Sequence, residues 1–130
     1  FGEVPDGLAA RGRAGLQIIT IRDEFFSTYR RRADFIQKYI FPGGMLPSEE
    51  RLKVQTDRAS LSWTGIERFG QDYAHTLAEW GRRFESAWDE ISKLGFDDRF
   101  RRLWRFYLSY CEAGFRSGRT DVVQLGLSKP

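Results

Sequence analysis

Three side chains in this sequence could take part in chemistry because of their type and spacing. Tyr107 and Cys111 are four residues apart, so on a helix they lie one turn apart on the same face. Tyr73 stands near the expected start of another helix, where its hydroxyl could help to hold an anion. Periodicity alone favours a plainer role, since aromatic side chains and a single cysteine at such spacings most often pack in a core.

Other kinds of site find little support in the sequence. His75 is the only histidine and has no cysteine or histidine partner nearby, so a zinc site is not expected. The sequence contains neither the Gly-Lys-Ser/Thr phosphate loop nor the Gly-x-Ser-x-Gly nucleophile turn. Cys111 is the single cysteine, which excludes an internal disulfide and is typical of a reducing compartment.

The composition is that of a globular protein with an arginine-rich surface. Of the 130 residues, 41% are hydrophobic and 15% aromatic, and no apolar run approaches the roughly 20 residues of a membrane span. The formal net charge is +3, with arginines grouped over 30–32, 82–83 and 99–105. Each group is either a solvated helix face with acidic neighbours or a surface that binds phosphate groups.

Apolar patterns and turn residues predict an α/β layer architecture. The three expected strands span 16–21, 61–69 and 121–127. The four expected helices span 25–40, 48–59, 73–91 and 97–118. Ser48 marks the start of the second, Asp97 or Asp98 caps the fourth, and Gly118 ends it. The uninterrupted β-branched run over 16–21 predicts a buried strand of a parallel sheet. Because three strands make a poor closed sheet, residues 1–130 are expected to form a single, incomplete domain.

Three segments carry a family resemblance. They are Tyr-Ile-Phe-Pro-Gly-Gly-Met-Leu-Pro-Ser over 39–48, Phe-Gly-Gln-Asp-Tyr-Ala-His-Thr-Leu-Ala-Glu-Trp over 69–80, and Arg-Phe-Tyr-Leu-Ser-Tyr-Cys-Glu-Ala-Gly-Phe-Arg over 105–116. In this order and at these spacings they resemble the C-terminal part of the cyclopropane-fatty-acyl-phospholipid synthase family. That family uses S-adenosylmethionine (SAM) to add one carbon to the double bond of a lipid acyl chain.

The resemblance implies a fold, and it implies that SAM is bound by residues upstream of this chain. It implies the C-terminal portion of a Rossmann-like SAM-dependent methyltransferase fold, with about three strands and four helices and without the SAM-binding half. The Gly-rich loop, the acidic residue that holds the ribose and a catalytic glutamate would all lie upstream. We therefore expect this chain by itself to be inactive and to bind SAM weakly at most.

The resemblance also assigns roles to individual residues. It implies that Tyr73, with Thr20 and Ile21, holds a bicarbonate ion that acts as the general base, because methylation of an alkene gives a carbocation that must lose a proton. Where the family has a histidine before the threonine, this sequence has Ile19. This departure puts the bicarbonate site in doubt, and a methyl-branched or methylene product becomes an alternative to the cyclopropane ring.

The remaining expected site residues would contact the acyl chain. The resemblance places the turn over 39–48 at the mouth of the acyl tunnel and the helix over 105–116 along its wall, where aromatic faces would stabilise positive charge. These substrate-binding residues are Tyr39, Phe41, Gly43, Gly44, Met45, Leu46, Tyr107, Cys111 and Phe115.

The expected partners follow from this reading. They are an unsaturated phospholipid acyl chain and an anionic membrane surface contacted by the arginine groups, which implies a cytoplasmic protein peripheral to the inner membrane surface. Strand 16–21 would expose an unpaired edge, so the chain is expected to self-associate. Two other functions stay open: a non-catalytic lipid- or protein-interaction module, and nucleic-acid binding by residues 99–116. We expect no nucleic-acid partner, because the aromatics there fall on the apolar stripe and not among the arginines.

Overall fold

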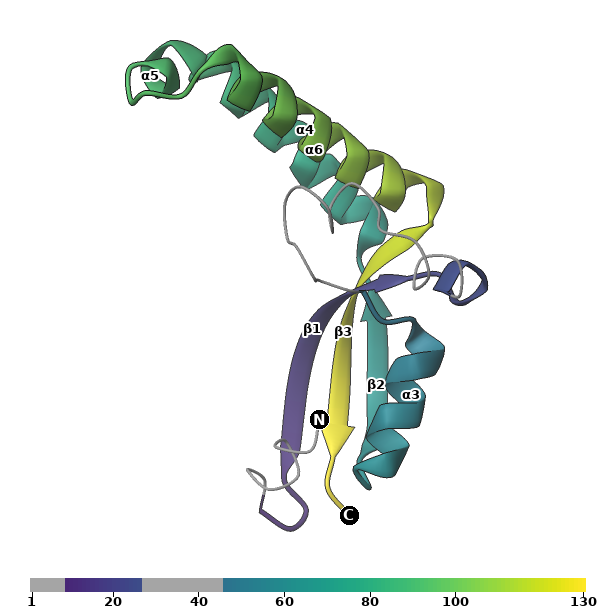
Figure 1. Cartoon of the computed structure of the whole chain (residues 1–130). Coiled ribbons are helices and arrows are strands. Elements are labelled where there is room, and N and C mark those ends of the chain that lie inside the picture. Colours follow the sequence, from purple (N-terminus) through teal and green to yellow (C-terminus); the bar gives the residue numbers. More distant parts are fainter. Residues whose placement is uncertain (1–8, 27–45) are drawn as a thin grey trace.

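The computed structural model describes residues 9–26 and 46–130, and these form a three-stranded sheet with a helix beside it and a long helical arm (Figure 1). The strands are β1 (Arg13–Ile21), β2 (Ser62–Arg68) and β3 (Thr120–Ser128). Their order in the sheet is β1-β3-β2, and both outer strands pair with β3 in the antiparallel sense. The predicted α/β class and all three predicted strands are confirmed.

The strand direction predicted for residues 16–21 is wrong. β1 pairs with β3 in an antiparallel register that sets Ile18 opposite Val123 and Thr20 opposite Asp121. β1 is also less buried than predicted, because alternate residues from Arg13 to Ile19 are exposed. An apolar, β-branched run suits a core strand of either direction, so composition could not reveal that β3 returns between two strands that run parallel to each other.

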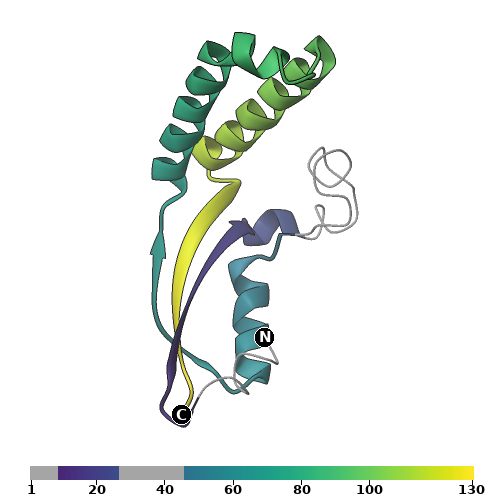
Figure 2. The same ribbon diagram turned by 90° about the vertical axis from the view of Figure 1, so that its left-hand side faces the viewer.

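Helix α3 (Glu49–Arg58) covers one face of the sheet (Figure 2). It begins where predicted, because the Ser48 hydroxyl accepts a hydrogen bond of 3.1 Å from the Arg51 amide. Its buried face carries Leu52 and Thr56, and the Thr56 hydroxyl accepts a 2.7 Å hydrogen bond from the Trp63 indole on β2. This bond satisfies a buried hydroxyl and fixes the helix against the sheet.

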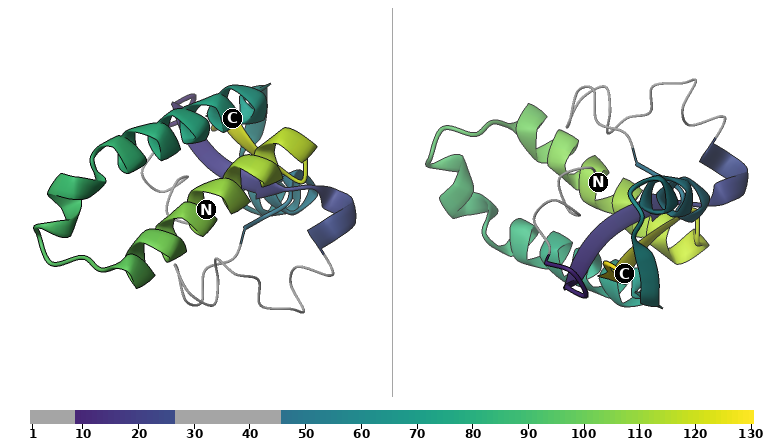
Figure 3. Two further views of the ribbon diagram at one scale, coloured as in Figure 1. Left: turned by 90° about the horizontal axis from the view of Figure 1, so that it is seen from above. Right: turned by 90° about the horizontal axis from the view of Figure 1, so that it is seen from below.

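The arm consists of α4 (Gly70–Ser86), α5 (Trp88–Ser92) and α6 (Asp98–Ser117). α4 and α6 pack against each other, and α5 lies at the end far from the sheet (Figures 1 and 3). The prediction of one helix over 73–91 is wrong at Ala87, where α4 ends and α5 begins. The aromatic spacing continues across this break, since Phe84 packs on Trp88 with ring centroids 5.8 Å apart, so periodicity could not show it.

The ends of α6 were predicted correctly. Asp97 caps its first turn by accepting a 2.9 Å hydrogen bond from the Phe100 amide. Gly118 ends it in the left-handed conformation, with φ of 78°. The predicted helix over 25–40 begins at Asp23, and its residues after Phe26 lie outside the described part of the chain.

Two apolar cores hold these parts together. Between the sheet and α3, the buried residues are Leu61, Leu125 and Leu127. Where the arm meets the sheet, the buried residues are Ala74, Leu77, Leu108, Phe115 and Val122. Val122 comes from β3 and the other four come from α4 and α6, so this second core ties the arm to the central strand.

Candidate functional site

Four of the predicted site residues come together between α4 and α6. We call Tyr73, Tyr107, Cys111 and Phe115 the tyrosine cluster. Phe115 is buried, and the other three are partly buried around the arm core. The Tyr73 and Phe115 rings meet edge to face with centroids 5.2 Å apart. The structure therefore joins two segments that are far apart in the sequence, residues 69–80 and 105–116.

Tyr107 is held in its neutral form. Burial raises the pKa of its hydroxyl above the ordinary value, and the neighbouring Cys111 and Tyr73 side chains raise it further. Its ring lies 4.8 Å from that of Trp104, one turn earlier on α6. A neutral aromatic face at this position can attract a cation through its ring quadrupole.

Tyr73 lies in the first turn of α4, at the positive end of the helix dipole. Its amide donates to the Phe69 carbonyl over 2.9 Å, and its ring packs edge to face on Trp80 at 5.9 Å. The start of α4 has no cap from its own N-cap side chain. The cap comes from β3 instead, because the Asp121 Oδ1 accepts a 2.8 Å hydrogen bond from the Gly70 amide.

This long-range cap explains why position 70 is glycine. A Cβ there would lie 2.5 Å from the Asp121 Oδ1, so any other residue would displace the capping carboxylate. Nearby, the Gln71 side chain donates a 2.8 Å hydrogen bond to the Phe115 carbonyl. Sequence reasoning missed both Asp121 and Gln71, since no spacing rule connects residues 51 or 44 positions apart.

The Asp121 cap gives a direct prediction. Asp121→Ala should lower the free energy of unfolding by about 1–2 kcal/mol, because the Gly70 amide loses its acceptor. Asp121→Asn keeps an oxygen at the same position and should retain most of the stability. Urea denaturation of both variants measures the difference, and equal stability of Asp121→Ala and wild type would show that the cap contributes nothing.

Thr20 and Ile21 lie at the end of β1, both 2% exposed. They pair with Asp121 and Thr120 of β3, and the Ile21 amide donates to the Pro47 carbonyl over 2.9 Å. Asp121 thus connects this end of β1 to the start of α4, from which Tyr73 projects. The structure places the three predicted anion-holding residues at one end of the sheet, and their roles stay predictions.

Ile19 does not supply what a bicarbonate ion needs. It lies opposite Val122 in the sheet, so the two share the face on which the arm core lies, and it is 39% exposed. An anion is held by hydrogen-bond donors, and an isoleucine side chain has none. The residues present therefore do not fit the family's bicarbonate site in full.

The predicted acyl-contacting residues Tyr39, Phe41, Gly43, Gly44 and Met45 lie outside the described residues, and Leu46 lies within them. Leu46 borders an almost wholly apolar hollow of about 360 Å³ beside β1 and α3. The other residues lining it are Ile18, Phe26, Pro47, Arg51, Leu52 and Gln55. None of them belongs to the tyrosine cluster, so this hollow brings Leu46 near the end of β1, where Ile21 bonds to Pro47, and not to the cluster.

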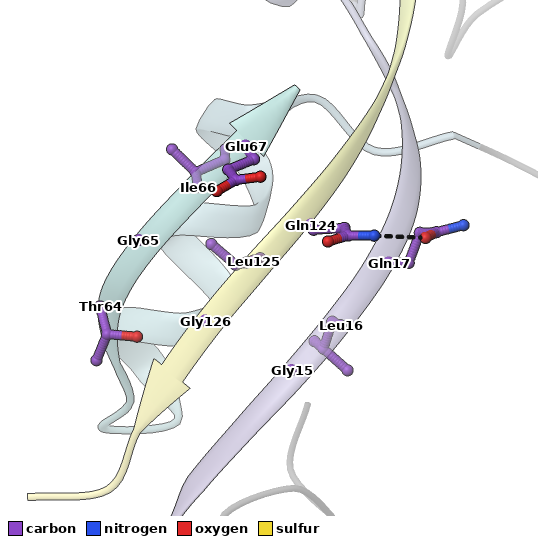
Figure 4. A pocket seen from close by; sticks show the side chains of 10 residues that line it. All are labelled: Gly15, Leu16, Gln17, Thr64, Gly65, Ile66, Glu67, Gln124, Leu125 and Gly126. Atoms are coloured by element: carbon purple, nitrogen blue, oxygen red, sulfur yellow. Dashed lines mark hydrogen bonds between the residues drawn. The ribbon is translucent and has the colours of Figure 1, made fainter. Parts of the chain in front are cut away.

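A larger hollow, of about 570 Å³, lies on the sheet face away from α3 (Figure 4). Gly15, Gly65 and Gly126 stand in one row across the three strands and form part of its floor. Beside them Gln124 donates a 3.1 Å hydrogen bond to Gln17. The hollow contains no predicted site residue, and among its lining residues only Glu67 carries a charge.

Many arginines of the arm are paired with glutamates. Glu85 of α4 binds Arg101 and Arg105 of α6, and these hydrogen bonds lower the pKa of its carboxyl to about 2. Arg82 and Arg83 pair with Glu79, and Arg116 with Glu112. These contacts favour the solvated-face interpretation for those arginines over phosphate binding.

The Glu85 pairs predict a pH dependence. The folded pKa lies below the ordinary value of 4.5, so the stabilisation is present above about pH 4.5 and is lost as the pH falls towards 2. The Glu85 side chain is 33% exposed, so solvent screening keeps the effect small. The melting temperature of Glu85→Gln should therefore be below that of wild type at pH 7, and the difference should shrink as the pH falls and vanish below about pH 2. A constant difference at every pH would contradict this.

Comparison with known proteins agrees with this geometry. The family model described as "Mycolic acid cyclopropane synthetase" matches residues 1–125. Tuberculostearic acid methyltransferase UfaA1 of Mycobacterium tuberculosis is 40% identical over 114 residues, covering 87% of this chain and 27% of the relative. The cyclopropane-fatty-acyl-phospholipid synthase of Escherichia coli K12 is 36% identical over 95 residues, covering 73% of this chain and 24% of the relative.

Similar solved structures come from the same group of proteins. The cyclopropane synthase MmaA2 from Mycobacterium tuberculosis superposes with a TM-score of 0.87 at 25% identity, covering 98% of this chain and 48% of that one. The mycolic acid cyclopropane synthase CmaA1, complexed with SAH and CTAB, gives 0.83 at 27% identity, covering 94% and 46%. The chain thus spans about a quarter of those curated relatives and under half of those solved chains. It belongs to the mycolic acid cyclopropane synthetase family of methyltransferases.

Proposed function

We propose that the complete protein is a SAM-dependent methyltransferase that adds a one-carbon unit to the double bond of an unsaturated phospholipid acyl chain. This chain would be its acyl-binding part. The observation that carries the proposal is the tyrosine cluster, in which two family segments meet between α4 and α6. Family membership and the relative solved with SAH support SAM as the methyl donor.

The cluster suits the charge that such a reaction creates. SAM supplies an electrophilic methyl group, and its transfer to an alkene leaves positive charge on the acyl chain. The neutral ring of Tyr107, with its raised pKa, would stabilise that charge through its π face. The hydroxyl of Tyr73, at the positive end of α4, would supply one donor to an anion held there, while Ile19 supplies none.

Ile19 bears on which product forms. With no side-chain donor at position 19 to help hold a bicarbonate ion, the proton could leave from a chain carbon and give a methyl-branched alkene, or from the added methyl group and give a methylene chain. The relative at 40% identity is named a tuberculostearic acid methyltransferase, and the relative at 36% is named a cyclopropane synthase. We therefore propose methyl transfer to the double bond as the common step and leave ring and branch as alternatives.

A membrane surface would present such a substrate. No helix within the described residues is long and apolar enough to cross a bilayer. We propose a peripheral, cytoplasmic enzyme at an anionic membrane surface, with no nucleic-acid partner. Contact with lipid headgroups would come from arginines other than those paired with Glu79, Glu85 and Glu112. Co-sedimentation with phosphatidylglycerol vesicles and with phosphatidylcholine vesicles tests the lipid contact. The proposal would be refuted if the complete protein bound neither kind of vesicle.

The experiment for the activity uses the complete protein with SAM and a monounsaturated phospholipid. We expect the acyl chain to gain one CH2 unit by mass spectrometry, and the 130-residue chain alone to give no product. Failure of the complete protein to modify any unsaturated phospholipid would overturn the proposal.

The edge of β1 predicts how the isolated chain behaves. β1 pairs with β3 on one side, and no other described strand pairs with its second edge. Unpaired backbone groups on an apolar edge strand favour pairing with another chain. We expect the 130-residue chain to form a dimer or larger assembly, and light scattering that shows a monomer at high micromolar concentration would contradict this.

A further inference from the structure

The far end of the arm exposes apolar side chains on a rigid turn. α5 ends at Ser92 and α6 begins at Asp98, and we call residues 93–96 between them the arm tip. Leu94 is 78% exposed and Phe96 is 44% exposed. Gly95, with φ of 103°, turns the chain between them. The Leu94 and Gly95 amides donate to the carbonyls of Ile91 and Ser92 over 3.0 and 3.1 Å, so the turn is continuous with α5.

A row of contacting aromatic rings restrains Phe96. The ring centroids of Phe96 and Phe100 are 4.5 Å apart, and the two planes are tilted by 33°. Phe100 in turn stacks on Trp104, with centroids 5.8 Å apart and nearly parallel planes. These contacts restrain the Phe96 side chain while leaving almost half of it exposed. Pre-ordered apolar groups lose little conformational entropy when they enter another apolar medium.

The shape and charge of the arm tip indicate what it enters. It is the end of a projecting arm, remote from the sheet (Figures 1 and 2), and such an end suits a soft medium that closes around it. Around it the exposed acidic residues Asp89, Glu90, Asp97 and Asp98 outnumber the exposed basic residues Lys93 and Arg99. The nearby Arg101 and Arg105 are paired with Glu85. Attraction to anionic headgroups would therefore not hold the arm tip at a membrane. Insertion of its apolar side chains into the lipid would.

We propose that Leu94 and Phe96 insert into the lipid surface from which the acyl substrate is taken, so that the arm tip anchors the enzyme by apolar contact. This rests on the proposed function for its substrate class. Leucine and an aromatic ring at the end of an amphipathic element suit the boundary between headgroups and acyl chains. The arm tip is distinct from the tyrosine cluster, which lies nearer the sheet end of the same helices.

The test uses the complete protein with the double substitution Leu94→Ser and Phe96→Ser. The matched control is Leu94→Ile with Phe96→Leu, which keeps the surface apolar. Partitioning onto phosphatidylcholine vesicles should fall about tenfold or more in the serine variant, since both side chains lose apolar burial, and should be nearly unchanged in the control. Raising the salt concentration should leave wild-type binding to these vesicles largely intact.

Assays of methyl transfer distinguish a failure of this inference from a failure of the proposed function. Methyl transfer to a short-chain unsaturated phospholipid below its micelle concentration should be the same in the serine variant and wild type, while transfer to vesicles should drop. If no lipid is methylated by either protein but vesicle binding still depends on the arm tip, the inference stands and the proposed function fails.

Three results would overturn the inference. The first is wild-type vesicle binding by the serine variant. The second is a fall of several degrees in its melting temperature, which would mean that the rest of the polypeptide covers the arm tip. The third is a change in its oligomeric state, which would make the arm tip a contact between copies.

Discussion

Replacing Phe115 with alanine is expected to lower the free energy of unfolding by about 3–5 kcal/mol. Phe115 is 3% exposed and belongs to the core that ties α4 and α6 to Val122 of β3. Its ring also supports Tyr73 edge to face at 5.2 Å. Removing it leaves a cavity at the junction of arm and sheet, which the surrounding helices can close only in part.

Urea denaturation measures this loss, and Leu94→Ala is the matched control. Leu94 is 78% exposed, so its truncation should change the free energy of unfolding by no more than about 0.5 kcal/mol. Equal stability of the two variants would mean that Phe115 is not part of the core described here. A Phe115→Leu variant should recover part of the stability by filling some of the cavity.

The second large effect is expected at Tyr73. Tyr73→Phe in the complete enzyme should lower kcat by about 10²–10⁴-fold, the usual contribution of a positioned proton-transfer group, because it removes the hydroxyl proposed to hold the anion. Phenylalanine keeps the ring contacts with Phe115 and Trp80, so the stability should not change. Single-turnover methyl transfer, followed by mass spectrometry, measures the rate.

Tyr107→Phe is the control for this variant. Its hydroxyl is neutral, and the role proposed for Tyr107 belongs to the ring face, which phenylalanine also provides. We expect a much smaller loss of kcat than at Tyr73. If Tyr73→Phe keeps full activity, or if Tyr107→Phe loses as much, the assignment of the anion-holding role to Tyr73 is wrong.

Local signals in the sequence predicted the parts of the fold that depend on local contacts. Ser48 and Asp97 cap their helices as expected, and Gly118 ends α6, because caps and left-handed glycines act within a few residues. The antiparallel pairing of β1 with β3 and the break at Ala87 were not predictable in this way. Strand direction depends on the return of the chain through the arm, and Ala87 is a good helix former with no local breaker beside it.

The candidate site was predicted in a similar, partial way. The i, i+4 spacing placed Tyr107 and Cys111 together, and the family resemblance brought in Tyr73 and Phe115, which the structure then joined. The Asp121 cap on Gly70 was missed because it forms only when β3 returns beside the start of α4. The residues over 39–45 lie outside the described part of the chain, so their predicted contact with the acyl chain stays a prediction.

The most direct test of the account is the reaction itself, carried out with SAM bearing a deuterated methyl group. The complete protein is given this donor with a monounsaturated phospholipid, and the acyl chains are analysed by mass spectrometry. We predict the gain of one carbon, with loss of one deuteron for a ring or methylene product and retention of all three for a methyl-branched alkene, which loses its proton from the chain instead. An unchanged acyl chain after complete incubation, with SAM bound by the protein, would contradict the account and require a different methyl acceptor.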